Sequence, residues 1–327
     1  MDKIIKPSSV TFDAEKLQRA VPFQLEKTAI PGVFTIPAPP AGFEPRTASP
    51  SELIRAGFPW KRPNAESEPV ARALWDRVMA REWRPEDAVP AVGRRRRRRP
   101  RGPRSDGPDL NSNWAGAVLT TGVWAGVVGA FQIPQISQPS EAAVFDEGFE
   151  GWEMSIWIGL GGYLPNNSNN LLQVGVTRQL LTNGMWGCFS WYEWWIAGNS
   201  AVPGVPEYTY ESLPLGLTVS PGDSVLCSVG YLLDGNGDTV GGGVWMANET
   251  TGVYGPRTLL PVPSGADFSG GSAEWIVEAP DGGEWGTSGG PQSSLPAFTP
   301  VAFDATVACG AEGIFGPWTD AVGSTVQ

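Results

Sequence analysis

Short apolar runs that alternate with turn residues fill the chain from about residue 107 to its end. The runs are rich in Val, Ile, Trp and Tyr, and Gly, Pro, Asn and Asp separate them. Strands at this spacing, without helical patterns between them, are typical of an antiparallel sandwich or barrel. We therefore predict an all-β domain, an antiparallel β-sandwich of two packed sheets. Its expected strands are Trp114–Leu119, Gly126–Gln132, Ser155–Leu160, Leu171–Leu181, Trp186–Trp195, Leu215–Val219, Ser224–Leu233, Gly241–Asn248, Gly271–Glu278 and Ala302–Ala308.

The first hundred residues have a different pattern, rich in proline and with only modest apolar content. A short helix is expected at Ser51–Ala56, with Ser51 as its N-cap. A longer helix is expected at Ser67–Glu82, whose apolar residues recur at helical spacing: Val70, Leu74, Trp75 and Val78. This small, partly helical segment has little to bury by itself, so we expect it to pack against another part of the protein.

Charge divides the chain into the same two parts. Met1–Asp106 has 21 Lys and Arg against 13 Asp and Glu, a net charge of +8, whereas Gly107–Gln327 has two arginines against 21 carboxylates, a net charge of −19. Between them lies Arg94–Arg99, six consecutive arginines that repel one another and favour an extended chain. We predict a leader or pro-segment-like module at 1–93, a basic linker at 94–110 and the sandwich at 111–327.

The arginine run has several interpretations. It is an exposed linker, a protease processing site, an electrostatic clamp on the acidic domain, or an attachment to nucleic acid or membrane. Nucleic acid is disfavoured because the acidic domain would repel phosphates. At neutral pH the acidic domain attracts the basic leader, so we expect contact between them. Acid would remove this attraction, and one hypothesis is therefore a pro-segment that acid releases.

The residues that are absent limit the chemistry. The chain has no histidine, which excludes Ser-His-Asp and Cys-His nucleophiles, histidine general bases and histidine-based zinc sites. Its three cysteines do not form a metal cluster, and the sequence leaves a Cys188–Cys227 disulfide open. No apolar run is long enough to span a membrane, and Met1–Phe23 has no apolar signal core, so the compartment is left open.

Gln173 lies on a strongly apolar predicted strand. Leu172 and Val176 point to one face of this strand, and Gln173 points to the other. A glutamine there either lies on a wet surface or lines a cleft, where its amide needs hydrogen-bonding partners. Gly175, two residues further on, is expected to leave open space beside it.

A second strand carries two carboxylates on one face. Glu274 and Glu278 share that face with Ile276, while Ala273, Trp275 and Val277 point the other way. Residues four apart on a strand are separated by about 13 Å, so the two glutamates cannot form one tight acid–base pair. At most one of them belongs to a given catalytic centre, and the other is free to line the same groove.

Several short motifs occur in one order along the chain and together resemble the eqolisin family of glutamic peptidases. The resemblance covers about Asn111 to Ala308. The motifs are Asn113–Val118 (NWAGAV), Trp157–Gly162 (WIGLGG), Leu172–Gly175 (LQVG), Trp191–Trp194 (WYEW), Ala247–Gly252 (ANETTG) and Ala273–Glu278 (AEWIVE).

The resemblance implies an acid-acting, metal-independent endopeptidase of polypeptide substrates, without a cofactor and with a substrate groove across one sheet. The family's catalytic glutamine falls on Gln173 and its catalytic glutamate on Glu278, and Trp157 matches a tryptophan near the active site. Glu278 would activate water, and the Gln173 amide would stabilise the oxyanion without titrating. The supporting candidates are Trp114, Trp157, Gly161, Glu193 and Glu274.

One position departs from the family pattern. Gly161 stands where the family usually has an aspartate close to the catalytic pair. Its absence weakens activity, alters the pH dependence, or is compensated by another carboxylate such as Glu193. Two other functions are kept as alternatives: a sandwich that binds or cleaves carbohydrate, suggested by the many tryptophans and paired carboxylates, and a catalytically inactive homologue.

Overall fold

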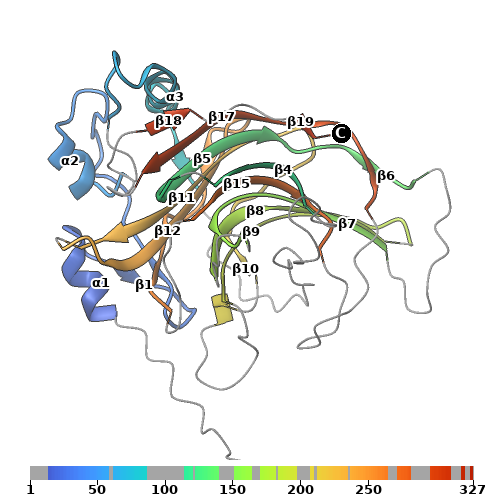
Figure 1. Ribbon diagram of the computed structural model, residues 1–327, viewed down its shortest axis with the longest axis horizontal. Coiled ribbons are helices and arrows are strands. Elements are labelled where there is room, and N and C mark those ends of the chain that lie inside the picture. The colour runs from blue at the N-terminus through green and yellow to red at the C-terminus, as the bar shows by residue number, and fades with distance from the viewer. Residues whose placement is uncertain are drawn as a thin grey trace, which may run out of the picture.

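The computed structural model describes residues 14–58, 62–86, 114–120, 122–139, 151–163, 170–181, 183–196, 207–209, 212–234, 236–263, 271–280 and 295–310, and the backbone of 318–320 and 325–326. Within these residues two antiparallel sheets pack face to face (Figure 1), so the predicted all-β sandwich is confirmed. The arginine run and the whole predicted linker, 94–110, lie outside the described residues.

The smaller sheet has six strands in the order β10-β9-β8-β7-β15-β4. Its central strands are long because apolar and β-branched residues continue along them without a breaker. The strands are β4 (Trp114–Leu119), β7 (Gly151–Gly161), β8 (Asn170–Leu181), β9 (Trp186–Ile196), β10 (Leu213–Pro214) and β15 (Ala273–Glu278).

The larger sheet has eleven strands in the described residues, in the main order β1-β2-β14-β12-β11-β5-β17-β18, with β13, β3 and β19 paired beside this path. Its strands are β1 (Glu26–Lys27), β2 (Phe34–Thr35), β3 (Arg84–Pro85), β5 (Trp124–Gln132), β11 (Ser224–Leu233), β12 (Thr239–Asn248), β13 (Val253–Tyr254), β14 (Thr258–Pro261), β17 (Val301–Gly310), β18 (Trp318–Asp320) and β19 (Thr325–Val326). A two-stranded ribbon, β6 (Ile136–Ser137) with β16 (Ala297–Phe298), and the 3₁₀ turn Glu207–Thr209 complete the sandwich.

The main core lies between the two sheets and follows strand alternation. On β7 and β8, the residues Ile156, Ile158, Leu172 and Val174 point into this core. Trp275 enters it from β15 and donates its indole N–H to the carbonyl of Val128 on the opposite sheet, at 3.0 Å. The alternate residues of the six-stranded sheet therefore point away from the core, to the outer face.

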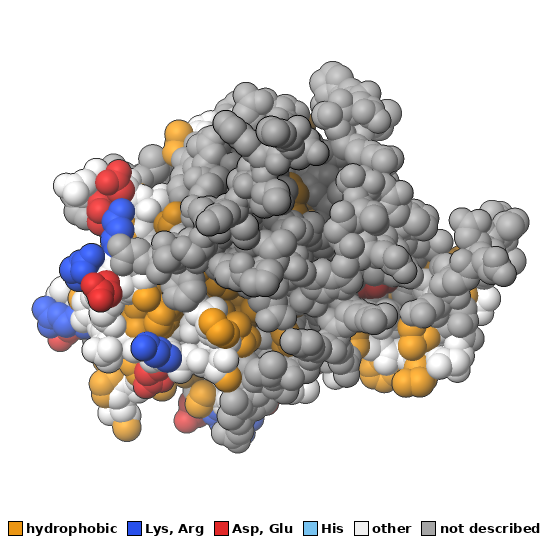
Figure 2. Space-filling model, turned by 90° about the horizontal axis from the view of Figure 1, so that it is seen from below, with side chains coloured by type: hydrophobic (Ala, Val, Ile, Leu, Met, Phe, Trp, Pro, Cys, Tyr) orange, Lys and Arg blue, Asp and Glu red, His pale blue; other side chains and the backbone are white. Residues whose placement is uncertain are grey.

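The leader forms a third layer. Helices α1 (Ala14–Ala20), α2 (Pro50–Arg55) and α3 (Pro69–Met79) lie on the outer side of the eleven-stranded sheet (Figure 1), and β1, β2 and β3 pair with strands of that sheet. Figure 2 shows basic and acidic side chains interspersed at the left, the end where Figure 1 places these helices.

Two details of the predicted helices were wrong. The N-cap of α2 is Ser49, whose hydroxyl accepts the N–H of Glu52 while the Glu52 carboxylate accepts the N–H of Ser49. This reciprocal capping box needs a glutamate three residues after the cap, which Ser51 lacks. On α3, Val70 is 45% exposed, and the buried face is formed by Ala71, Leu74, Trp75, Val78 and Met79.

Two further expectations were settled by the fold. Leu215–Val219 is not a strand, because Gly216 has a left-handed φ of +83° and the Leu217 N–H bonds the Ser190 hydroxyl instead of a neighbouring strand. Cys188 and Cys227 lie on different sheets and, like Cys309, are free thiols, so the disulfide that the sequence left open is absent. Among the described residues no helix is long and apolar enough to cross a membrane.

Candidate active site

The outer face of the six-stranded sheet carries every side chain that the sequence singled out. Strand pairing fixes this, because residues opposite one another across a ladder share a face. Trp114 lies opposite Glu278, Gly159 lies opposite both Glu274 and Gln173, and Gln173 also lies opposite Glu193. The residues on this face are Trp114, Ser155, Trp157, Gly161, Gln173, Trp191, Glu193, Glu274, Ile276 and Glu278.

Glu278 is fully buried and held by an indole. The Trp157 Nε1–H donates to Glu278 Oε2 at 2.8 Å, a charge-assisted geometry when the carboxylate is ionised. Trp114 packs edge-on against Trp157, with ring centroids 4.8 Å apart and an interplanar angle of 79°. Trp114 thereby fixes the Trp157 ring, whose N–H in turn fixes the direction of the Glu278 carboxylate.

Gln173 is also fully buried and is held by a second carboxylate. Its Nε2 donates to Glu193 Oε2 at 3.1 Å, and the Ser212 hydroxyl donates to the same oxygen at 3.2 Å. A carboxylate accepts and does not donate, so Glu193 fixes which end of the glutamine is the amide nitrogen. One N–H of that nitrogen is used, and the second remains for another acceptor.

Trp157 separates the two halves of the site. Glu278 pairs with Ser155 on β7 and Gln173 pairs with Gly159, so they lie two strands apart and four residues apart along β7. Gly175, expected to leave open space beside Gln173, instead makes room for Trp157. A Cβ at Gly175 would meet the Ile156 carbonyl oxygen at 2.4 Å and the Trp157 Cβ at 2.6 Å.

Glu274 lies across Gly159 from Gln173, with no side chain between them on β7. It is fully buried, and within the described residues neither of its carboxyl oxygens makes a hydrogen bond of normal geometry, although the Ser272 hydroxyl lies nearby. Burial raises the pKa of Glu274 well above its ordinary value, and the nearby Ser272 hydroxyl offsets this only in part. Glu274 is therefore a neutral carboxylic acid in acid solution, able to donate one hydrogen bond.

Buried polar atoms without partners gather on this face. Buried polar groups in native proteins are nearly always hydrogen-bonded, so each exception calls for a reason. On the outer face of this sheet the atoms without a hydrogen-bonding partner among the described residues are Trp114 Nε1, Gln173 Oε1, Trp191 Nε1, Ser272 Oγ and both carboxyl oxygens of Glu274. Together they provide donors and acceptors, which are the groups that a peptide backbone needs.

Gly161 ends strand β7 in a left-handed conformation. Its φ is +83°, that of Gly162 is +88°, and the Gly161 N–H bonds the Ser272 carbonyl at 3.0 Å. A side chain is strained at such a φ, although aspartate tolerates it better than most residues. The glycine therefore suits the local backbone, and the carboxylate that hydrogen-bonds Gln173 is that of Glu193.

Two residues of this site were missed by the sequence prediction. Ser212 precedes a two-residue strand and belongs to no motif, so only the fold reveals its bond to Glu193. Trp191 was part of the WYEW motif but was not selected; it packs in an apolar cluster with Trp157, Leu171 and Ile276. Its place opposite Gly175 was predictable only from the strand register.

Fold and site together define an antiparallel sandwich that presents carboxylate and amide groups on the outer face of one sheet. Among the described residues no group of three His, Cys, Asp or Glu is placed to hold a metal ion. The family model described as the Peptidase A4 family matches residues 112–326, and the chain belongs to this family. The resemblance to the eqolisins is thereby confirmed.

Individual relatives are distant. Aspergillopepsin-2 of Aspergillus niger is 28% identical over 186 residues, which are 54% of this chain and 58% of that protein. Scytalido-glutamic peptidase, solved with a transition state analog inhibitor, is 22% identical with a TM-score of 0.47, over 64% of this chain and 84% of that one. SCP-B, an eqolisin solved with the tripeptide Ala-Ile-His, is 21% identical with a TM-score of 0.44, over 64% and 82%.

Proposed function

We propose that the protein is an acid-acting endopeptidase in which Glu278 is the general base and acid and Gln173 is the oxyanion donor. The observation that carries this proposal is that Gln173 and Glu278 share one sheet face with buried polar atoms that have no partner among the described residues. Membership of a peptidase family supports the same substrate class, polypeptides. The chemistry needs no metal, because carboxylate and amide groups supply every step.

In the proposed reaction the Glu278 carboxylate removes a proton from a water molecule as the water oxygen attacks the carbonyl carbon of the scissile peptide bond. The negative charge that develops on the carbonyl oxygen is stabilised by the second N–H of the Gln173 amide. Glu278 then gives its proton to the amide nitrogen. The C–N bond breaks, the products are a carboxylic acid and an amine, and Glu278 is again ionised.

The neighbouring groups have positioning roles in this proposal. Trp157 holds one oxygen of Glu278, and Glu193 holds the Gln173 amide with its nitrogen facing the site. Glu193 thus supplies an orienting carboxylate where Gly161 has none. Trp114, Trp191 and Glu274 would contact the substrate through the polar atoms that have no partner among the described residues.

Digestion of acid-denatured casein tests the proposal with Gln173→Ala and Glu278→Gln. Each should lower kcat/KM by about 100-fold or more, as is usual when an oxyanion donor or general base is removed. Gln179→Ala, on the same strand beyond the site, and Glu26→Gln, on the exposed β1, should keep wild-type activity. The mechanism would be refuted if the wild-type chain were inactive, or if Gln173→Ala or Glu278→Gln kept wild-type activity. Glycan-binding and glycan-cleavage assays would then separate the alternatives.

A further inference from the structure

Apolar side chains of the leader and the sandwich pack together in shared clusters. Leu74 and Trp75 of α3 and Leu53 of α2 are nearly fully buried, in a cluster that includes Leu226 and Val307 on the outer face of the eleven-stranded sheet. A second cluster joins leader and sheet residues further along: Leu17, Leu25, Phe34, Val240 and Leu259. Apolar contacts of this kind do not change with pH.

Backbone pairing joins the two parts as well. Strand β2 pairs with β14 through Phe34 opposite Leu259, and β3 pairs in parallel with β13 through Arg84 opposite Val253. The leader thereby covers edges of the sheet that would otherwise present unpaired N–H and C=O groups. These hydrogen bonds also have no titratable member.

Arg257, one of the two arginines after residue 107, binds the leader from the sandwich. Its guanidinium donates to the carbonyl oxygens of Ala56 at 2.8 Å and Gly57 at 2.7 Å, and also to that of Pro37. Burial lowers the pKa of Arg257 to about 10, so it is still charged throughout acid and neutral solution. Its partners are carbonyl groups, which acid does not protonate.

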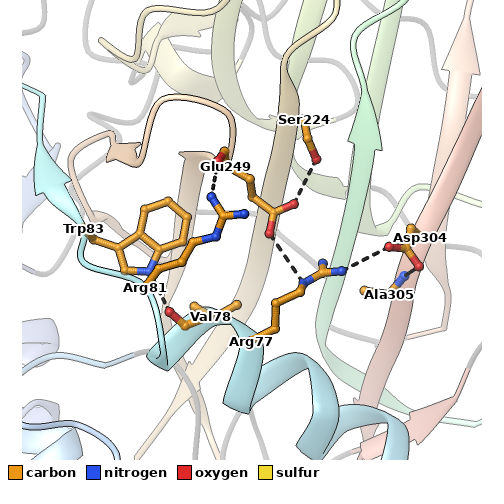
Figure 3. A network of polar contacts seen from close by, with 8 residues as sticks. All are labelled: Arg77, Val78, Arg81, Trp83, Ser224, Glu249, Asp304 and Ala305. Carbon is orange, nitrogen blue, oxygen red and sulfur yellow. Dashed lines mark hydrogen bonds and ion pairs between the residues drawn. The ribbon is translucent and has the colours of Figure 1, made fainter.

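Among the described residues, the ion pairs between leader and sandwich are the two made by Arg77 (Figure 3). Arg77 of α3 lies 3.5 Å from Glu249 and 3.2 Å from Asp304, whose side chain is 74% exposed. Arg81 donates to the backbone carbonyl of Glu249. The Glu86 carboxylate accepts the N–H of Thr218 at 3.0 Å. The exposed Asp304 pair contributes little, whereas the Glu249 carboxylate is 7% exposed and also accepts from the Ser224 hydroxyl of its own sheet, so its protonation is the one acid-sensitive step at this contact.

The net charge of the part of the leader that contacts the sandwich is much smaller than the +8 of residues 1–106, so its electrostatic attraction to the acidic sandwich is weaker. Residues 14–86 contain 11 Lys and Arg against 9 Asp and Glu, a net charge of +2. Most of the positive charge comes from the eight arginines of 94–104. The body of the leader is therefore close to neutral, and its contact with the sandwich does not depend on opposite net charges.

We propose that residues 14–86 are a permanent structural layer of the protein, which stays bound to the sandwich in acid and after the linker is cut. The leader helices lie on the outer face of the eleven-stranded sheet, β1, β2 and β3 extend that sheet, and Ile30 and Val33 reach the main core between the sheets, whereas the candidate site lies on the outer face of the other sheet. Release of this layer would expose an apolar sheet face without uncovering Gln173 or Glu278. A retained layer fits this arrangement better than a pro-segment that acid releases.

The test uses the full chain with Arg94–Arg99 replaced by the recognition sequence of a site-specific protease. After the cut, size-exclusion chromatography is run at neutral pH, at about pH 3.5 and in about 1 M NaCl. The two fragments should elute together under all three conditions and separate only in denaturant. Elution of free leader at pH 3.5, or in salt, would overturn the proposal.

Variants of the cut chain identify the contacts that hold the leader on the sandwich. Arg77→Ala removes the two ion pairs and should leave co-elution at pH 3.5 unchanged. Leu74→Ala should lower the urea concentration at which the leader dissociates, whereas Val70→Ala, on the exposed side of the same helix, should not. Release caused by Arg77→Ala alone would show that charge holds the leader. If Leu74→Ala fails to fold, the pH and salt series on the parent chain still decides.

Discussion

The Glu274 carboxyl group makes stability depend on pH in an unusual direction. Most carboxylates of folded proteins have a lowered pKa and stabilise the fold as pH rises, but burial raises the pKa of Glu274. At a pH between the ordinary glutamate pKa and the raised pKa, the folded state holds a proton that the unfolded chain has lost. Its contribution to stability is complete below the ordinary glutamate pKa and is lost as pH rises through the raised value.

Glu274→Gln tests this behaviour because glutamine has nearly the same shape and no charge. The substitution should raise the free energy of unfolding at pH 7, where the wild type must bury a charge or pay to keep its proton, and change it little at pH 4. Denaturant unfolding at both pH values measures the difference. Glu26→Gln, at an exposed site, should have no such pH-dependent effect. An equal change at the two pH values would contradict the assignment of the raised pKa.

At the scale of single strands, Gly175 fixes the position of Trp157. The two residues are opposite one another on β8 and β7, and a methyl group at Gly175 would lie within 2.6 Å of the Trp157 Cβ. Gly175→Ala should therefore displace the indole from Glu278. A displacement of about 1 Å at a catalytic group can lower the rate about 100-fold, and we expect a loss of kcat/KM of that order on casein.

Gly310→Ala is the matched control for this substitution. It lies on β17 of the other sheet, where an added Cβ would have only an ordinary contact, 3.7 Å from the Val123 carbonyl oxygen. It should keep both fold and activity. Normal activity in folded Gly175→Ala would show that the orientation of Trp157 is not needed for the reaction.

Most strands could be predicted from the sequence, because alternation is a local property. The expected Ser224–Leu233 and Trp114–Leu119 match β11 and β4, and most of the others differ from the observed strands by a few residues at the ends. Leu215–Val219 shows the limit of this signal. Its apolar residues alternate as in a strand, yet they fill the core from a loop that a left-handed glycine bends.

The candidate site was predictable only in part. The resemblance located Gln173, Glu278 and the supporting residues, and pairing then placed them on one face. Contacts between residues far apart in the chain could not be predicted, because no local sequence pattern links Ser212 to Glu193 or Trp157 to Glu278. The role of Gly175 was also misjudged, because the sequence does not show which side chain fills the space that a glycine leaves.

At the scale of the whole molecule, the leader should unfold together with the sandwich. Leu74 is 6% exposed in the cluster that joins α3 to the sheet, whereas Val70, on the same helix, is 45% exposed. Leu74→Ala should lower the free energy of unfolding by about 2–5 kcal/mol, as for other buried leucines. Val70→Ala should change it by less than about 0.5 kcal/mol.

Urea unfolding followed by both tryptophan fluorescence and far-UV circular dichroism measures this effect. If the leader and the sandwich share one core, both probes should report one transition, and Leu74→Ala should shift it as a whole. An early transition of the leader helices alone in Leu74→Ala, with the later one unmoved, would show two units that unfold separately.

The position of the leader on the face opposite the candidate site has a consequence for how the protein can change over evolution. Under the proposed function, substitutions on α2 and α3 change the stability of the protein without contacting the substrate, and substitutions around Trp157 change catalysis without loosening the leader. Effects at such distant, unconnected positions are expected to add independently. Lineages can therefore adapt to harsher surroundings and to new substrates by separate mutational routes, in either order.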